Sequence, residues 1–225
     1  MGNVTTKPVI VVTGTLREAA VLADNGVEVI AGGSDPERLA REVAQAAEHA
    51  AGIVSFGMGG GIDRRLRLGQ WVIGKRLSGT FHAKCDERWV AALQARLPHA
   101  AVGSIHADGH LLSEQHDKVE RSWASAALAA DMESHIAGEA AAHANVPFVI
   151  LRCISDIAEA ELPSAVSVMM RPDGGVDVGA VLRSVMGQPG QLPHLTRTLI
   201  GFAKAYRELI AGAKLAGDRL AFDAR

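Results

Sequence analysis

The sequence has little of what marks several classes of protein. Only two of its 225 residues are cysteines, Cys85 and Cys153, and they lie far apart without the close spacing of a zinc or redox motif. We therefore expect two buried, unpaired cysteines in a reducing compartment. The nine histidines show no paired-ligand spacing, and His82, His106 and His110 are interpreted as surface or core residues. No metal site is expected.

Basic charge and long apolar runs are also scarce. The formal net charge is −2 and no basic stripe follows the chain, so we expect no nucleic-acid partner. The longest apolar runs, such as 147–151, are far too short to span a bilayer, and no secretory leader pattern opens the sequence, which favours a cytoplasmic protein. A content of 48% hydrophobic and 21% charged residues indicates a globular protein, and the length suits one domain over residues 1–225.

The most informative stretch joins two runs of small residues. Asp131-Met132-Glu133 ends one alanine-rich run and opens another, from Ile136 to Ala144. Packing does not explain these acids, because a buried charge costs several kcal/mol unless it is paired or neutralised. Ser155-Asp156 follows the apolar strand predicted at 147–151, where open α/β sheets place their ligands. Asp156 alone fits a structural role equally well, but together with Glu133 it predicts an active site.

Strand and helix patterns alternate along the chain. Strands are predicted at 8–12, 27–31, 52–56, 68–74, 101–106 and 147–151, and helices at 16–22, 34–50, 86–97, after Ser113, and at 136–144, 178–185 and 196–215. This alternation predicts an α/β fold, a three-layer α/β/α sandwich with a central mixed sheet.

Two loops after predicted strands carry candidate site residues. Thr15 and Glu18 have the spacing of a helix capping box, yet Glu18 also stands at the carboxyl edge of the first strand, where a catalytic carboxylate fits equally well. Four glycines lie among Gly57-Met58-Gly59-Gly60-Gly61, and their backbone N–H groups could form a cradle for an anion or a sugar. A simple tight turn is the alternative. The run matches neither the dinucleotide fingerprint nor a P-loop, which disfavours a nucleotide-dependent oxidoreductase.

With these residues noted, the chain resembles the nucleoside phosphorylase and nucleosidase superfamily that includes 5′-methylthioadenosine/S-adenosylhomocysteine nucleosidase. The resemblance runs to about residue 158, through the Gly14–Glu18 segment, the Gly57–Ile62 segment, Asp131-Met132-Glu133 and Pro147–Asp156. The length and the segment 188–193 look most like hopanoid-associated phosphorylase, a branch thought to remove adenine from adenosylhopane. The resemblance implies the phosphorylase/hydrolase-like fold and cleavage of an N-glycosidic bond.

The resemblance also implies a role for each site residue. Asp156 matches the acid that protonates or hydrogen-bonds purine N7, with Ser155 beside it, and Glu133 matches the carboxylate that binds the ribose hydroxyls. Met132 lies under the sugar, next to Asp131, and Gly57, Met58 and Gly60 border the substrate. Leu111 and Leu112 fall where the family packs an aromatic and an aliphatic residue on the base, so an aromatic contact is missing there. To donate a proton at neutral pH, Asp156 needs burial or a neighbouring anion that disfavours its charge.

The nucleophile stays open between water and phosphate. Glu18 matches the carboxylate that orients water in the hydrolytic branch. The phosphorolytic branches carry a serine and an arginine where this chain has Met58 and Ser55, which removes a hydroxyl and a cation. Arg17, Arg64 or Arg65 would supply positive charge in their place. Hydrolysis is therefore favoured without a cofactor, and phosphate is the alternative co-substrate.

The part of the substrate beyond the nucleoside is also open. Leu162, Val166, Val168, Met169 and Met170 would line a trough for a lipid tail or bury a subunit interface, since related nucleosidases are dimers and a homodimer is expected. A lipid-linked nucleoside leaves transient membrane association open. The alternatives are a nucleosidase of the 5′-methylthioadenosine/S-adenosylhomocysteine type and a non-catalytic nucleoside or lipid carrier on the same fold.

Overall fold

One mixed sheet of eight strands lies at the centre of the computed structural model, which describes residues 7–112, 114, 118, 126–167, 171–175 and 177–225. The strands are β1 (Val9–Thr13), β2 (Glu28–Ala31), β3 (Gly52–Gly61), β4 (Trp71–Gly79), β5 (Ala83–Lys84), β6 (Ala101–Ala107), β7 (Ala127–Asp131) and β8 (Phe148–Asp156). Their order is β2-β1-β3-β7-β6-β4-β5, and β8 pairs with both β3 and β4. The second pairing closes part of the sheet on itself.

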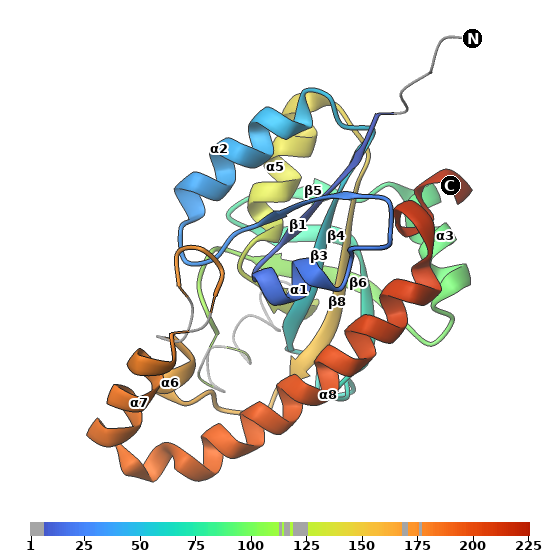
Figure 1. Ribbon diagram of the computed structural model, residues 1–225. Coiled ribbons are helices and arrows are strands. Elements are labelled where there is room, and N and C mark those ends of the chain that lie inside the picture. The colour runs from blue at the N-terminus through green and yellow to red at the C-terminus, as the bar shows by residue number, and fades with distance from the viewer. Residues whose placement is uncertain (1–6, 113, 115–117, 119–125, 168–170, 176) are drawn as a thin grey trace, which may run out of the picture.

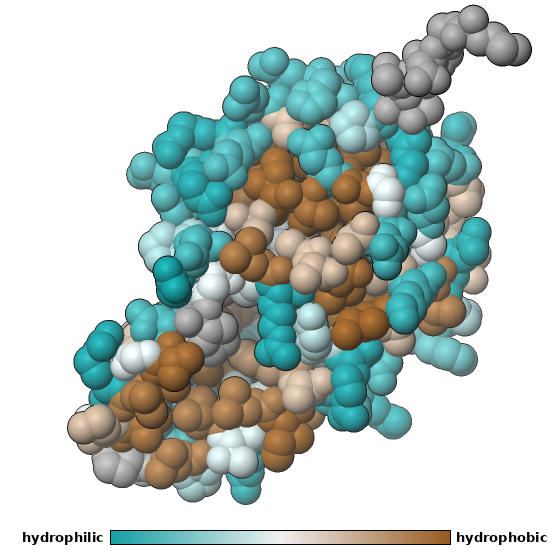
Figure 2. All heavy atoms as spheres, viewed as in Figure 1, coloured by the Kyte–Doolittle hydropathy of each residue, from teal (hydrophilic) through white to brown (hydrophobic). Residues whose placement is uncertain are grey.

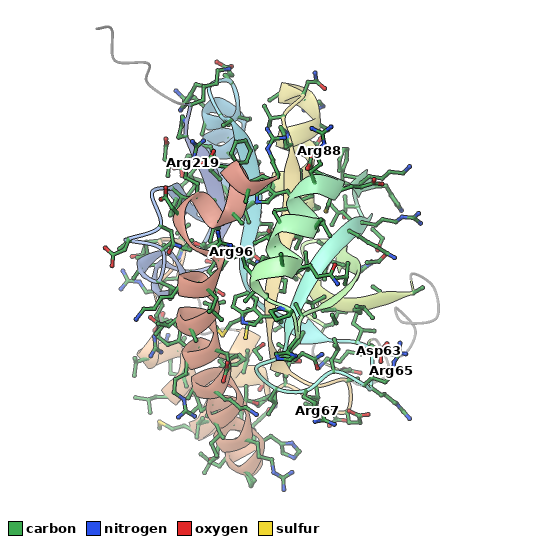
Figure 3. The ribbon with its side chains drawn as sticks, turned by 90° about the vertical axis from the view of Figure 1, so that its right-hand side faces the viewer. Asp63, Arg65, Arg67, Arg88, Arg96 and Arg219 are labelled. Atoms are coloured by element: carbon green, nitrogen blue, oxygen red, sulfur yellow. The ribbon has the colours of Figure 1, made fainter. Side chains whose placement is uncertain are left out.

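Helices cover both faces of this sheet (Figure 1). They are α1 (Leu16–Ala20), α2 (Pro36–Ala47), α3 (Glu87–Arg96), α5 (Ser134–Ala144), α6 (Ser164–Ser167), α7 (Val178–Gly187) and α8 (Leu192–Ala216), with 3₁₀ helices η1 (Pro189–Gln191) and η2 (Asp218–Ala224). Helices α2 and α5 pack together on one face, and α3, α8 and η2 pack together on the other. In Figure 3, α3 and α8 stand in front of the sheet. The predicted three-layer fold with a mixed sheet is confirmed.

Most of the predicted elements are present, with shifted ends. The helix predicted at 196–215 begins at Leu192, and the strand predicted at 68–74 begins at Trp71, because Gly69 turns the chain with φ +81°. The alanine run before Asp131 forms the strand β7. The helix predicted after Ser113 lies largely outside the described residues.

The glycine run is the main correction to the predicted elements. Residues Gly57–Gly61 are not a turn but the second half of β3, which pairs with β8 through Gly59 and with β7 through Gly60 and Gly61. The glycines are needed for this close pairing: a Cβ on Gly59 would lie 3.0 Å from the carbonyl oxygen of Ala130. The alternative of a tight turn is therefore wrong. A cradle for an anion or a sugar stays a prediction, and the Met58 N–H in this run donates to Glu18 Oε1 at 2.7 Å.

Strand β8 is also longer than its apolar sequence suggests. It runs on through Arg152 to Asp156, and all nine of its residues are buried. Its neighbours β3 and β4 form hydrogen bonds with its backbone, and side chains far away in sequence form hydrogen bonds with Arg152. The strand therefore delivers Asp156 to the interior of the molecule.

Candidate active site

A cavity of about 250 Å³ opens where β7 and β8 end and where α1 follows β1. Ten of the eleven predicted site residues line it: Glu18, Met58, Gly60, Leu111, Leu112, Asp131, Met132, Glu133, Ser155 and Asp156. The eleventh, Gly57, does not. The three candidate acids Glu18, Glu133 and Asp156 come from distant parts of the sequence, and the fold brings them to one cavity.

Glu18 serves the helix cap and the cavity at once. Its Oε2 accepts hydrogen bonds from the backbone N–H and the hydroxyl of Thr15, both at 2.9 Å, and the Thr15 hydroxyl caps the backbone of Glu18 in return. Its Oε1 accepts the Met58 N–H at 2.7 Å. Burial raises the pKa of Glu18, against these hydrogen bonds and the charge of Arg152. The helix cap is confirmed, and the catalytic role of Glu18 stays a prediction that its place at the cavity allows.

Gly57 supports Glu18 from behind. Its φ is +152°, which L side chains rarely adopt, and a Cβ there would lie 2.6 Å from Glu18 Oε1. The predicted contact between Gly57 and substrate is therefore replaced by an indirect role, since a glycine at this position leaves room for the carboxylate.

Asp131 fixes the turn that carries Glu133. Its Oδ1 accepts the backbone N–H groups of Glu133 at 2.9 Å and Ser134 at 2.7 Å. Its Oδ2 accepts from the Ser134 hydroxyl at 2.6 Å and from Arg152 Nε at 2.9 Å. Both oxygens are thus used by the protein, which makes Asp131 an anchor for the neighbouring acid. The charge of Arg152 and these hydrogen bonds lower the pKa of Asp131, although its burial opposes them.

Arg152 is a buried cation that sequence reasoning did not assign to the site. Besides Asp131 it contacts Ser55 Oγ at 2.6 Å and approaches Glu133 Oε2 to 3.9 Å. Ser55 itself carries no charge, but the neighbouring strand β8 supplies a cation beside it. The sequence feature that could have indicated this buried cation is an arginine directly after an apolar strand rich in β-branched residues. Its N–H groups are directed at protein atoms.

The acidity of Glu133 is strongly perturbed. Burial raises its pKa to about 8; the charges of Asp131 and Glu18 add to this effect and the charge of Arg152 opposes it. Glu133 and Glu18 are close, since a Cβ on Gly14 would lie 3.0 Å from Glu133 Oε1 and 3.3 Å from Glu18 Oε2. Two carboxylates therefore face one wall of the cavity.

Asp156 accepts hydrogen bonds at both carboxylate oxygens. Ser155 Oγ donates to Oδ1 at 2.9 Å, and Lys118 Nζ donates to Oδ2 at 2.5 Å. Lys118 is 1% exposed, and it also donates to the carbonyl oxygens of Ile157 and Ala160. The neighbour of Asp156 is thus a cation, where the sequence argument required an anion or a purely apolar site. Lys118 stands in a polar stretch with no pattern to distinguish it, so sequence reasoning missed it.

The opposite part of the cavity is apolar. Leu111, Leu112, Leu162 and Val166 line it, together with Phe202 of α8. An aromatic side chain is therefore present in the cavity wall, although not at the position where the resemblance led us to look for one. Residues 168–170, which were predicted to extend this trough, lie outside the described part of the chain.

Comparison with known proteins agrees with this fold. A family model described as the Phosphorylase superfamily matches residues 1–183. The chain belongs to the Phosphorylase superfamily. A search of curated protein sequences gives no match.

Solved structures share the superfamily fold at low sequence identity. The S-adenosylhomocysteine nucleosidase of Streptococcus pyogenes, in complex with 5-methylthiotubericidin, is similar with a TM-score of 0.60 and 19% identity over 90% of this chain and 98% of its own. The futalosine hydrolase of Helicobacter pylori gives a TM-score of 0.67 and 12% identity, over 96% of this chain and 97% of its own.

In this member of the phosphorylase superfamily, the arginines predicted to attract phosphate are placed elsewhere. The Arg17 guanidinium stacks on the Tyr206 ring, 4.4 Å from its centroid, and Arg64 pairs with Glu159 at 3.6 Å. Arg65 pairs with Asp63 at 2.6 Å on the surface (Figure 3). None of these three lines the cavity. The predicted contribution of Arg17, Arg64 or Arg65 to a phosphate site is not supported by their positions.

Proposed function

We propose that the protein hydrolyses the N-glycosidic bond of an adenine nucleoside, and that the nucleoside is adenosylhopane. The observation that carries the proposal is the shared cavity, with Glu18 and Glu133 on one wall and the Lys118–Asp156 pair in the same lining. Breaking such a bond builds positive charge on the ribose and negative charge on the departing purine. Groups of suitable charge, held in place before the reaction, lower the barrier.

The sugar side of the reaction falls to the two glutamates. Glu133 binds the ribose hydroxyls through its carboxyl group. Glu18 orients a water molecule for attack on C1′ and accepts its proton as the new C–O bond forms and the C–N bond breaks. The carboxylate of Glu18 is already held on both oxygens, which fixes its position.

The purine side falls to Asp156 and Lys118. The electron pair of the broken C–N bond moves into the purine, which takes a proton at N7. In our proposal the Lys118 ammonium donates a proton to the Asp156 carboxylate, and Asp156 donates a proton to N7. Lys118 is then a neutral amine until it takes a proton from solvent. Lys118 acts through Asp156 and is a positioning residue in this scheme.

Water is favoured over phosphate by charge. Glu18 and Glu133 lie close together at the place proposed for the nucleophile, and the ionised form of either acid would repel a phosphate there. The two cations that border this region, Arg152 and Lys118, are paired with Asp131 and Asp156. A phosphate ion would have to displace these pairs.

The cavity supports a substrate whose tail extends outside. A volume of about 250 Å³ lies near the lower limit for small-molecule sites, which suits a nucleoside without its 5′ substituent. Leu162, Val166 and Phe202 would then meet the first part of an apolar tail. The alternative, a 5′-methylthioadenosine/S-adenosylhomocysteine-type activity, is favoured by the likeness to the Streptococcus pyogenes nucleosidase.

The experiment is adenine release from adenosylhopane and from methylthioadenosine, with and without phosphate in the buffer. We expect release without phosphate, with a higher kcat/KM for adenosylhopane. Release that needs phosphate would overturn hydrolysis, and preference for methylthioadenosine would overturn the lipid substrate. No adenine from either compound would favour the carrier.

A further inference from the structure

Helix α7 exposes large apolar side chains along one face. Val178, Leu182 and Met186 recur at four-residue spacing on one face, and their exposed fractions are 63%, 58% and 80%. No residue of α7 is buried among those whose side chains are described. Three large apolar side chains therefore lie against water.

Polar side chains at and after the end of α7 contact α6. Ser184 Oγ and the side chains of Gln188 and Gln191 lie within hydrogen-bond distance of Ser164 Oγ in α6, between 3.2 and 3.4 Å. Gln191 Nε2 also donates to the Ser184 carbonyl oxygen at 2.9 Å. These bonds hold α7 with its apolar face outward.

The first half of α8 continues the same surface. Leu192, Leu199 and Ile200 are also exposed large apolar residues, and Figure 2 shows hydrophobic residues gathered over α7 and the start of α8 at the lower left. We call the six residues Val178, Leu182, Met186, Leu192, Leu199 and Ile200 the outer apolar face. Contiguous exposed patches of this kind mark interaction sites.

The segment that carries the outer apolar face has more cations than acids. Between Asp177 and Glu208 the sequence carries Arg183, Arg197, Lys204 and Arg207 and no acid, although the whole chain has a net charge of −2. All four of these cations are exposed. Apolar side chains with basic neighbours are typical of segments that lie on anionic membranes.

We propose that the outer apolar face docks on an anionic lipid bilayer surface. A second copy of the chain is the less favourable occupant, because a two-fold contact would bring the same cations of both copies together. No helix in the described part of the chain is long and apolar enough to cross a membrane, so the contact is peripheral. The inner side of α8 reaches the cavity through Phe202, and Leu162 and Val166, before and in α6, line the cavity beside it. A docked molecule could thus take an apolar substrate from the bilayer.

The test is flotation of the full-length protein with vesicles of phosphatidylcholine, alone or mixed with phosphatidylglycerol. We expect binding to the anionic vesicles, weaker binding to the neutral ones, and a decrease with added salt. The double variant Leu182→Ser, Met186→Ser and the double variant Arg183→Glu, Arg197→Glu should each lower the bound fraction about tenfold or more. Leu215→Ser is the matched control: Leu215 lies near the other end of α8, is 58% exposed, and its variant should bind as wild type does.

Three results would overturn the proposal. The first is that the wild type floats with neither kind of vesicle. The second is that Leu215→Ser loses as much binding as the double serine variant. The third is that the double serine variant only converts a dimer into a monomer and binds vesicles as the wild type does. The inference stands apart from the proposed catalysis. If the protein floats with vesicles but releases no adenine, membrane docking stands and the proposed nucleosidase activity is wrong. If it releases adenine but does not float, the nucleosidase activity stands and membrane docking is wrong.

Discussion

Charges buried together are the main feature of this molecule at the scale of residues. Sequence reasoning found Glu133 and Asp156 because packing does not explain acids beside apolar runs, and it found Glu18 because this residue stands at the carboxyl edge of the first strand. It did not find Lys118 and Arg152, whose partners Asp156 and Asp131 lie 38 and 21 residues away along the chain. Spacing along a sequence reveals local pairs such as Thr15 with Glu18, and pairs made by the fold escape it.

Asp156→Asn tests the departure of the purine. An amide cannot pass a proton to N7, so kcat for adenine release should fall by about 10²–10⁴-fold. Asp173→Asn changes an exposed acid in the same way and should leave kcat unchanged. Equal activity of the wild type and Asp156→Asn, with both folded by circular dichroism, would remove Asp156 from the mechanism.

Lys118→Met tests the supply of that proton. Without the ammonium, Asp156 must take its proton from solvent, so we expect kcat to fall more than KM changes, by about 10²-fold at neutral pH, with partial recovery in more acidic buffer. The control Lys75→Met removes an exposed lysine of β4. A kcat that follows the wild-type pH profile would contradict the proton relay.

Glu133 should make stability depend on pH. Its pKa is about 8 in the folded chain and near 4.3 when unfolded, so the folded state holds the proton more firmly. The contribution of the Glu133 proton to the free energy of unfolding is complete below about pH 4 and is lost as pH rises through about 8. The free energy of unfolding falls by at most about 1.4 kcal/mol per pH unit. Thermal unfolding between pH 5 and 9 should show a flatter pH dependence of Tm for Glu133→Gln. Glu139→Gln, at an exposed site of the same helix, should retain the wild-type slope.

At the scale of elements, alternating apolar and polar runs predicted the strands and helices well. The errors fall at strand ends, where β3 continues through glycines and β8 continues through Arg152. Glycine is a weak strand former, and a charged residue usually ends an apolar strand, so both signals pointed the wrong way. Close packing of β7 and β8 on β3 outweighs them. These two extensions position Met58, Gly60, Ser155 and Asp156 at the cavity.

Gly57→Ala tests how β3 supports α1. The new Cβ would stand at a φ of +152° and 2.6 Å from Glu18 Oε1, so we expect lower stability by about 1–3 kcal/mol and a loss of activity from displacement of Glu18. Gly187→Ala is the contrast, because nothing lies within 4 Å of its added Cβ and alanine favours the end of α7. Urea unfolding and adenine release should separate the two variants. Similar behaviour of both would show that Gly57 does not support Glu18.

At the scale of the whole molecule, one sheet serves two different surfaces. The ends of its strands hold the charged residues of the cavity. Helices α6 and α8 contribute apolar residues to the cavity lining, and α7 and α8 present the outer apolar face. The three-layer fold was predictable because its elements alternate. The outer apolar face was not, since the pattern of α7 is that of an ordinary buried helix and only its orientation in the structure shows which side is exposed.

The central claim is that two distant acids act on a single nucleoside, and a crystal structure with a non-hydrolysable adenosine analogue tests it most directly. The account predicts the ribose hydroxyls against Glu133 and purine N7 within about 2.6–3.2 Å of Asp156. An analogue bound outside this cavity, or bound in it with its base toward Glu133, would contradict the account.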